Sequence, residues 1–101
     1  MPLYCIRCKD VPNSAPLRAN VLTEHRAYLS SQADKIVVAG AALAEDGEIA
    51  TGSVFIVNVP DLAAAEAFND GDPFTPEGVF ESRDITRMRA GFWFPENVET
   101  T

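Results

Sequence analysis

The chain is poor in the residues that bind metals or carry redox chemistry, because its 101 residues include one histidine and two cysteines. Cys5 and Cys8 form a C-x-x-C pair, which supplies only half of a typical four-ligand zinc site, and His25 is the only imidazole that could add to it. The surrounding residues favour a strand, where a separation of three places two side chains on opposite faces. We therefore expect two buried, unpaired thiols, no metal site and no cofactor.

Basic residues are also scarce, and long apolar runs are absent. Eight Lys and Arg against fifteen Asp and Glu give a formal charge of −7, without a basic cluster that could neutralise phosphates. The longest apolar runs, 36–43 and 54–57, are far shorter than the roughly 20 residues of a membrane-spanning helix. The N-terminus lacks a charged region that leads into an apolar segment. We expect a cytoplasmic protein with neither nucleic acid nor membrane as a partner.

The chain has the length of one small domain, and 47% of its residues are apolar. We assign residues 1–95 to this domain and residues 96–101 to a flexible C-terminal tail. Apolar periodicity and turn residues predict a strand over 2–9, a helix over about 17–33 with Ser14 as N-cap, strands over 36–43 and 49–59 joined at Asp46-Gly47, a helix over 62–68 and a strand over 79–88.

This order, βαββαβ, predicts an α+β, ferredoxin-like fold, in which a four-stranded antiparallel sheet carries both helices on one face. The second and third strands are apolar at nearly every position, which favours burial on both faces. A second copy of the chain, packed sheet to sheet, would cover the other face, so we expect a homodimer. The aromatic run Phe92-Trp93-Phe94 is expected to dock on this sheet or on the partner.

His25 is a candidate for acid–base chemistry, since histidine side chains gain and lose protons near neutral pH. On the predicted helix it shares a side with Leu22 and Leu29, and Arg18 lies on the same side two turns earlier. The alternative interpretation is a half-buried histidine bonded to backbone, with Arg18 as a solvated charge. Spacing alone leaves both interpretations open.

Asp72 is a candidate to orient that imidazole. It lies in the turn 69–74 and precedes Pro73, which holds it in an extended conformation. The alternative is that Asp72 only caps the short turn 73–75. Three further residues could contact a ligand: Ser53 after Gly52, Gly40 in the second strand, and Arg7 as an anion clamp. A β-bulge at Gly40 and a salt bridge at Arg7 are the competing interpretations.

Several of these residues occur together in a recognisable order. They are the opening strand Leu3-Tyr4-Cys5-Ile6, Arg18, His25 with Tyr28-Leu29, Ala39-Gly40, Gly52-Ser53, the Ala-Ala-Ala-Glu-Ala helix, and Asp72-Pro73-Phe74. From about Leu3 to Met88, the chain resembles the YciI-like (YCII-related) family of the dimeric α+β-barrel superfamily. It departs from the family pattern at Ala41, where a proline is frequent, and at Arg7, where many relatives have an uncharged residue.

The resemblance implies a ferredoxin-like domain, a homodimer with facing sheets that forms a dimeric α/β barrel, and a His–Asp dyad in a cleft, which maps onto His25 and Asp72. Few members of the family have an assigned reaction, and one of them dechlorinates a chlorinated hydroquinone. The candidate catalytic residues are therefore His25 and Asp72, and the candidate substrate-binding residues are Arg7, Arg18, Ser53 and Gly40.

Three functional hypotheses follow from the sequence. The first is an enzyme that uses the His–Asp dyad on a small anionic or phenolic substrate, as an isomerase, a lyase or dehalogenase, or a hydrolase. The second is a non-catalytic module with the same dimeric fold that binds a small molecule or a partner. The third is a purely structural role, with His25 sealed in a dry core. The hypotheses differ in whether the His25 and Asp72 side chains meet at a place that a ligand can reach.

Overall fold

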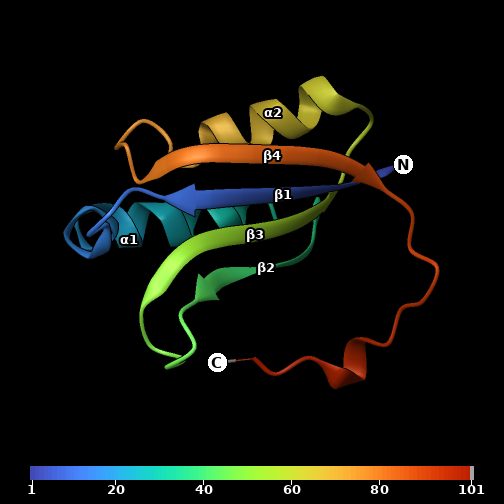
Figure 1. The fold of residues 1–101 in the computed structure, drawn as a ribbon. Helices are drawn as coiled ribbons and strands as arrows, with labels where there is room; N and C mark the ends of the chain where they lie inside the picture. The colour runs from blue at the N-terminus through green and yellow to red at the C-terminus, as the bar shows by residue number, and fades with distance from the viewer. Residues whose placement is uncertain (101) are drawn as a thin grey trace.

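The six predicted elements are present in the predicted order. The computed structural model describes residues 1–100, so Thr101, the last residue of the predicted tail, lies outside the described residues. The elements are β1 (Leu3–Asp10), α1 (Ala15–Ser31), β2 (Ile36–Leu43), β3 (Ala50–Asn58), α2 (Leu62–Gly71), β4 (Phe80–Met88) and a short 3-10 helix, η1 (Pro95–Asn97). The strands form one antiparallel sheet in the order β2-β3-β1-β4 (Figure 1). The predicted ferredoxin-like fold is confirmed.

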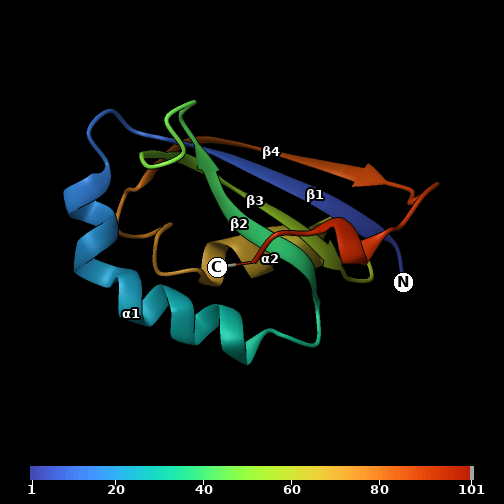
Figure 2. The same ribbon diagram turned by 90° about the horizontal axis from the view of Figure 1, so that it is seen from below.

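Both helices lie on the same side of the sheet (Figures 1 and 2). Strand β1 alternates between the two sides: Tyr4, Ile6 and Cys8 are buried beneath the helices, and the residues between them point the other way. The buried side chains of β1 join those of β3 and α2 in one apolar core, whose largest members include Phe55 and Phe68. We call the helix-covered side of the sheet the inner face and the other side the open face.

Residues close together in the sequence fix the turn between β2 and β3 and the start of α2. In the turn between β2 and β3, Asp46 Oδ1 accepts hydrogen bonds from the backbone N–H groups of Glu48 and Ile49. Gly47 has φ of +74°, a conformation that favours glycine. At the start of α2, the Asp61 side chain accepts a bond from the backbone N–H of Ala64 at 2.9 Å, which makes it the N-cap.

Helix α1 differs from its predicted form in two respects. It starts at Ala15 and ends at Ser31, two residues earlier than predicted at each end, and Val21 has the non-helical angles φ −127° and ψ 20°. The resulting kink is visible in Figure 2. Ser14 occupies the N-cap position, but its hydroxyl donates to Asp10 Oδ2 at 2.6 Å and makes no capping bond. The hydroxyl is drawn away from the helix because Asp10 is a buried, charged acceptor.

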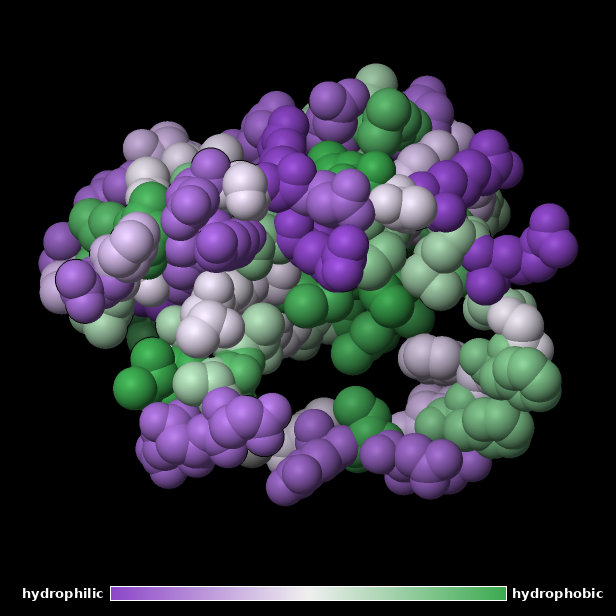
Figure 3. All heavy atoms as spheres, viewed as in Figure 1, coloured by the Kyte–Doolittle hydropathy of each residue, from purple (hydrophilic) through white to green (hydrophobic). Residues whose placement is uncertain are grey.

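Within residues 1–100 no helix covers the open face, which is apolar around β3 and polar toward β4, where it carries Arg7, Lys9 and Asp84. Leu3, Cys5, Val54 and Ile56 lie on it half-buried, by pairing and alternation along β1 and β3. The C-terminal residues turn back beyond the β2 edge of the sheet, and an open gap separates them from the body (Figures 1 and 3). Phe92 is 86% exposed, and Trp93 and Phe94 are more than half exposed. The expectation that this run docks on its own sheet is therefore wrong for the single chain.

Both cysteines are free, as predicted, and they lie on opposite faces of the sheet. Cys8 is buried on the inner face, whereas Cys5 is only half-buried, because the open face lacks a covering layer. Among residues 1–100, no helix is long and apolar enough to cross a membrane.

Candidate functional site

His25 and Asp72, which are 47 positions apart in the sequence, meet between α1 and the loop that follows α2. His25 Nδ1 lies 2.7 Å from Asp72 Oδ1, a distance typical of a charge-assisted hydrogen bond. The Asp72 side chain is fully buried, and the His25 side chain is 12% exposed. The pair therefore has a buried carboxylate behind an imidazole that reaches the surface.

Asp72 is held in place by its own loop. Its backbone is extended, with φ −67° and ψ 124°, as expected before Pro73. Its Oδ1 accepts a hydrogen bond from the backbone N–H of Phe74 at 3.0 Å, in addition to the contact with His25. The turn-capping role and the His25 contact, which the sequence presented as alternatives, thus belong to the same oxygen. The other oxygen, Oδ2, is buried and is the one buried side-chain N or O atom without a hydrogen-bond partner in residues 1–100.

The arrangement leaves one nitrogen of His25 available for chemistry. An ionised carboxylate has only lone pairs, so the tautomer compatible with the contact carries its proton on Nδ1 and donates it to Asp72. The other nitrogen, Nε2, then has a free lone pair and makes no hydrogen bond within residues 1–100. Because Nε2 is not among the buried unpartnered atoms of that range, it is not sealed from solvent. These contacts argue against a dry-core role for His25.

Arg18 lies on the inner face, but its guanidinium is engaged by protein groups. Its Nε and Nη2 donate to the two oxygens of Asp10, at 2.7 and 3.0 Å. Its Nη2 also contacts the Gly52 carbonyl oxygen at 2.7 Å and Ser53 Oγ at 3.1 Å. With 14% of its side chain exposed, Arg18 is neither the solvated charge of the alternative interpretation nor a free anion clamp. Ser53 is buried and takes part in the same network.

Arg7 and Gly40 lie on the open face, so the structure does not bring them together with His25. In the strand register, Arg7 pairs with Val54, and Val54 pairs with Gly40. The Arg7 side chain is 67% exposed, and its Nη2 lies 3.3 Å from Asp84 Oδ2, which matches the salt-bridge interpretation. The register shifts of β2 fall at 36–38 and 42–43, so Gly40 forms no bulge. The six candidate residues therefore divide into four on the inner face and two on the open face.

The sequence analysis missed a contact between Tyr28 and Gly71 that joins the two helices beside the site. Tyr28 OH donates to the Phe68 carbonyl oxygen at 2.8 Å. A Cβ at Gly71 would lie 2.5 Å from this hydroxyl, so only glycine permits the approach. Burial, together with the negative charge of Asp72, raises the pKa of Tyr28. Tyr28 follows His25 by three residues, and Gly71 directly precedes Asp72. This closeness in the sequence to the two candidate catalytic residues was the signal that could have pointed to the contact.

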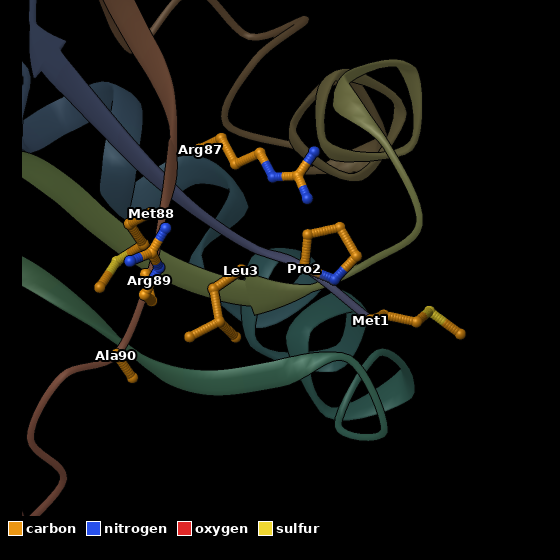
Figure 4. Close-up of a pocket in the computed structure, with 7 residues that line it drawn as sticks. All are labelled: Met1, Pro2, Leu3, Arg87, Met88, Arg89 and Ala90. Atoms are coloured by element: carbon orange, nitrogen blue, oxygen red, sulfur yellow. The ribbon is translucent and has the colours of Figure 1, made fainter.

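Two concave regions lie away from the His25–Asp72 pair. A cavity of about 630 Å³ at the start of β1 and the end of β4 is lined by Met1, Pro2, Leu3, Arg87, Met88, Arg89 and Ala90 (Figure 4). A smaller one, of about 170 Å³, is lined by Asn69, Asp70, Thr75, Phe80, Glu81, Ser82 and Arg83. Neither is lined by His25 or Asp72. Within the described part of the chain, no group of three His, Cys, Asp or Glu residues is placed to hold a metal ion.

The fold and the site geometry define a small α+β protein with a histidine that reaches the surface and contacts a buried carboxylate. Residues 2–89 match the YCII-related domain, and the chain belongs to this family. It is 34% identical over 97 residues to the protein YciI of Escherichia coli O6:H1 and equally to that of Shigella flexneri. Each match covers 89% of this chain and 99% of the relative.

Two solved structures share the fold. The first is the 5-chloro-2-hydroxyhydroquinone dehydrochlorinase TftG of Burkholderia phenoliruptrix, in complex with 2,5-dihydroxybenzoquinone. It is 31% identical, covers 88% of this chain and 95% of its own, and superposes with a TM-score of 0.79. The second is an uncharacterised NIPSNAP domain protein of Burkholderia xenovorans, which is 12% identical with a TM-score of 0.53. It covers 94% of this chain and 99% of its own, and it supports the fold alone.

Proposed function

We propose that this protein is an enzyme that performs acid–base chemistry on a small phenolic substrate, with His25 as the base and Asp72 as the group that orients it. The observation that carries the proposal is the 2.7 Å contact of Nδ1 with a buried carboxylate, which leaves Nε2 open to the surface and without a hydrogen-bond partner in residues 1–100. A carboxylate behind an imidazole fixes its tautomer and stabilises the imidazolium that forms when the base accepts a proton.

The proposed chemistry starts with the removal of a hydroxyl proton. Nε2 of His25 accepts the proton, and the negative charge of Asp72 balances the positive charge on the imidazole. The imidazolium can then return a proton to a carbon or oxygen of the same substrate. No cofactor is required, because the step moves protons and electron pairs within one molecule.

The reaction class is an elimination, and it is suggested by the likeness to TftG, a dehydrochlorinase of a chlorinated hydroquinone. In a dehydrochlorination, the substrate loses one proton and one chloride ion. One hydroxyl proton is moved to the ring carbon that bears chlorine, which forms a C–H bond there and the first new carbonyl group. Loss of a second hydroxyl proton forms the second carbonyl group, and the electron pairs shift through the ring as chloride leaves with the electron pair of the C–Cl bond. For this net change the protein must accept a proton from a substrate hydroxyl, and His25 is the base proposed to accept it.

The test is chloride release from 5-chloro-2-hydroxyhydroquinone and related halogenated hydroquinones, with Asp72→Asn compared with Asp70→Asn. Both changes convert a carboxylate to an amide two positions apart, but Asp70 is exposed and bonds to Arg83 instead of His25. We expect Asp72→Asn to lower kcat by about 10²- to 10⁴-fold, the usual size of a general-base contribution, and Asp70→Asn to change it little. A folded Asp72→Asn variant with the kcat of the wild type would contradict the proposal.

A second candidate function is a module that binds a small molecule without turnover. It is favoured by the position of the two described cavities, neither of which includes His25. A rise in the thermal unfolding temperature with 2,5-dihydroxybenzoquinone, in the absence of turnover of any halogenated hydroquinone, would support this function over the enzyme.

We also propose that the active form is a homodimer joined through the open face. The half-buried apolar residues of β1 and β3 on this face and the exposed aromatic run 92–94 are what a second copy would cover. Sedimentation at micromolar concentration should give twice the 10.9 kDa of one chain. Ile56→Asp on the open face should shift the mass to one chain, whereas Glu24→Gln on α1 should not; a folded wild-type monomer would exclude the dimer.

A further inference from the structure

We propose that Phe74 is the positioning residue of the His25–Asp72 pair, fixing the carboxylate through its backbone and the imidazole through its ring. The proposal rests on the proposed function for its consequences in catalysis, but its geometric content is independent of any substrate. Phe74 is fully buried, and in the described structure it contacts both members of the pair.

The first contact is made by the backbone. The Phe74 N–H donates to Asp72 Oδ1 at 3.0 Å, the same oxygen that contacts His25 Nδ1. This bond orients the carboxylate so that the oxygen it holds faces the helix. Within residues 1–100 Asp72 Oδ2 has no hydrogen-bond partner, so the orientation of the carboxylate depends on the bonds made to Oδ1.

The second contact is made by the ring. The Phe74 and His25 rings are stacked, with centroids 3.7 Å apart and planes inclined by 6°. A hydrogen bond at Nδ1 fixes one point of the imidazole, but the ring can still tilt around that point or turn about its bond to Cβ. Turning by half a rotation would present a carbon to Asp72 and move both nitrogens. A flat surface against the imidazole restricts these motions because it holds the ring plane.

The third contact keeps the Phe74 ring itself in place. The guanidinium carbon of Arg18 lies 5.0 Å from the Phe74 centroid, over the ring. Because the imidazole covers one face of the ring at contact distance, the geometry points to the guanidinium on the other face. The separation of Arg18 and His25 by two helical turns, roughly 10 Å, leaves room for a ring between them. Arg18 is fixed in turn by its two bonds to Asp10, and Phe80 meets the Phe74 ring edge on, with centroids 6.0 Å apart.

Phe74 thereby joins three parts of the molecule at one point: the loop after α2, the helix α1 and, through Arg18, the end of β1. The kink at Val21 lies between the two α1 residues that touch the ring. The consequence for His25 is a single tautomer and a single ring orientation, with Nε2 facing outward.

The experiment measures the tautomer of His25 directly. The chain has one histidine, so the two ring-nitrogen resonances in a ¹⁵N NMR spectrum need no assignment to a residue. At pH about 8.5, above the usual titration range of histidine, the two resonances are far apart when one tautomer dominates and approach each other when the tautomers interchange. The variants are Phe74→Leu and the matched control Phe55→Leu, which removes an aromatic ring that is also buried but packs on Phe68 instead of His25.

We expect well-separated resonances in the wild type and in Phe55→Leu, and a separation reduced to half or less in Phe74→Leu. Thermal unfolding of each variant establishes that it is folded. If Phe74→Leu does not fold, Phe74→Met, whose flexible side chain fills the space without a flat surface, takes its place, and Phe74→Tyr should restore the wild-type spectrum. A folded Phe74→Leu or Phe74→Met variant with the wild-type separation, or an equal loss in Phe55→Leu, would overturn the proposal.

The outcome separates this inference from the proposed function. Loss of the single tautomer in a protein that turns over no halogenated hydroquinone would reject the proposed reaction and retain Phe74 as the positioning residue. Turnover by the wild type, with an unchanged spectrum in Phe74→Leu, would do the reverse. If both proposals hold, Phe74→Leu should lower kcat by at least about 10-fold and change KM less, because Phe74 is buried and touches no ligand.

Discussion

The two faces of the sheet use the same kinds of residue in opposite ways. On the inner face, Arg18 is bonded to a buried carboxylate and Cys8 is buried against Asn69. On the open face, Arg7 forms an exposed ion pair with Asp84, and Cys5 is half-buried without a layer above it. The difference is one of desolvation: charges and thiols beneath the helices must find protein partners, whereas those on the open face still have water.

The residues of the proposed acid–base chemistry lie on the inner side of the sheet. The inner-face network links Asp10, Arg18, Phe74, His25 and Asp72 in an unbroken series of contacts. Around β3 the open face presents apolar surface, which is suited to association, and toward β4 it carries the exposed Arg7–Asp84 ion pair. Matched substitutions, one on each face, test whether the same change affects stability more on the inner face than on the open face.

The largest difference is expected between the two arginines. Arg18→Met keeps the apolar stem but leaves Asp10, a nearly fully buried carboxylate, without its cation. Removing one partner of a buried ion pair costs about 3 to 5 kcal/mol, so urea unfolding should show a loss of this order. Arg7→Met, at an exposed pair, should leave the free energy of unfolding close to that of the wild type. Equal losses in the two variants would contradict the division between the faces.

A smaller difference is expected between the two cysteines, and it depends on pH. Burial raises the pKa of the Cys8 thiol from 9.0 to about 11. The unfolded chain therefore releases this proton at lower pH than the folded protein does. The stabilisation is fully present below pH 9 and is lost as the pH rises to about 11, by an amount on the order of 2 to 3 kcal/mol.

Denaturant unfolding of Cys8→Ala and Cys5→Ala between pH 8 and 11 tests this expectation. The stability of Cys8→Ala should depend less steeply on pH than that of the wild type, and Cys5→Ala should retain the wild-type slope. The contribution of Tyr28, whose pKa is also raised, is common to all three proteins and cancels in the comparison. The same slope in Cys8→Ala as in the wild type would show that the thiol is not desolvated.

The smallest effect is expected at Asp84 on the open face. Hydrogen bonds from Thr86 and Arg7 lower the pKa of Asp84 below its usual value of 3.8. The folded protein thus favours the ionised form, and the resulting stabilisation is present above pH 3.8 and lost as the pH falls below it. Asp84→Asn should make stability slightly less sensitive to acid between pH 5 and 3 than Asp34→Asn, at another exposed carboxylate. A marked fall in stability at pH 7 in Asp84→Asn would mean that the open face is less solvated than its exposure indicates.

The fold and part of the site could be predicted because their signals are local. The Asp46-Gly47 turn, the Asp61 cap and the alternation along β1 each depend on residues within a few positions of one another. The extended backbone of Asp72 follows directly from Pro73. A tertiary cause is needed for Arg83 in β4, which shares the inner face with Ile85 and faces the helices because Asn69 and Asp70 accept its hydrogen bonds.

The sequence by itself determined the order of the elements, the opposite directions of Cys5 and Cys8, and the type of residue placed in each turn, because backbone preferences and periodicity act over one or two turns. Only the tertiary structure decided that Asp10 would engage Arg18, that Arg7 and Gly40 would lie on the open face, and that Phe74 would stack on His25. The Asp10–Arg18 contact joins residues eight positions apart, and the Phe74–His25 contact joins residues nearly fifty positions apart. They form because burying polar groups under the helices requires partners, and the chain offers those partners only once it has folded.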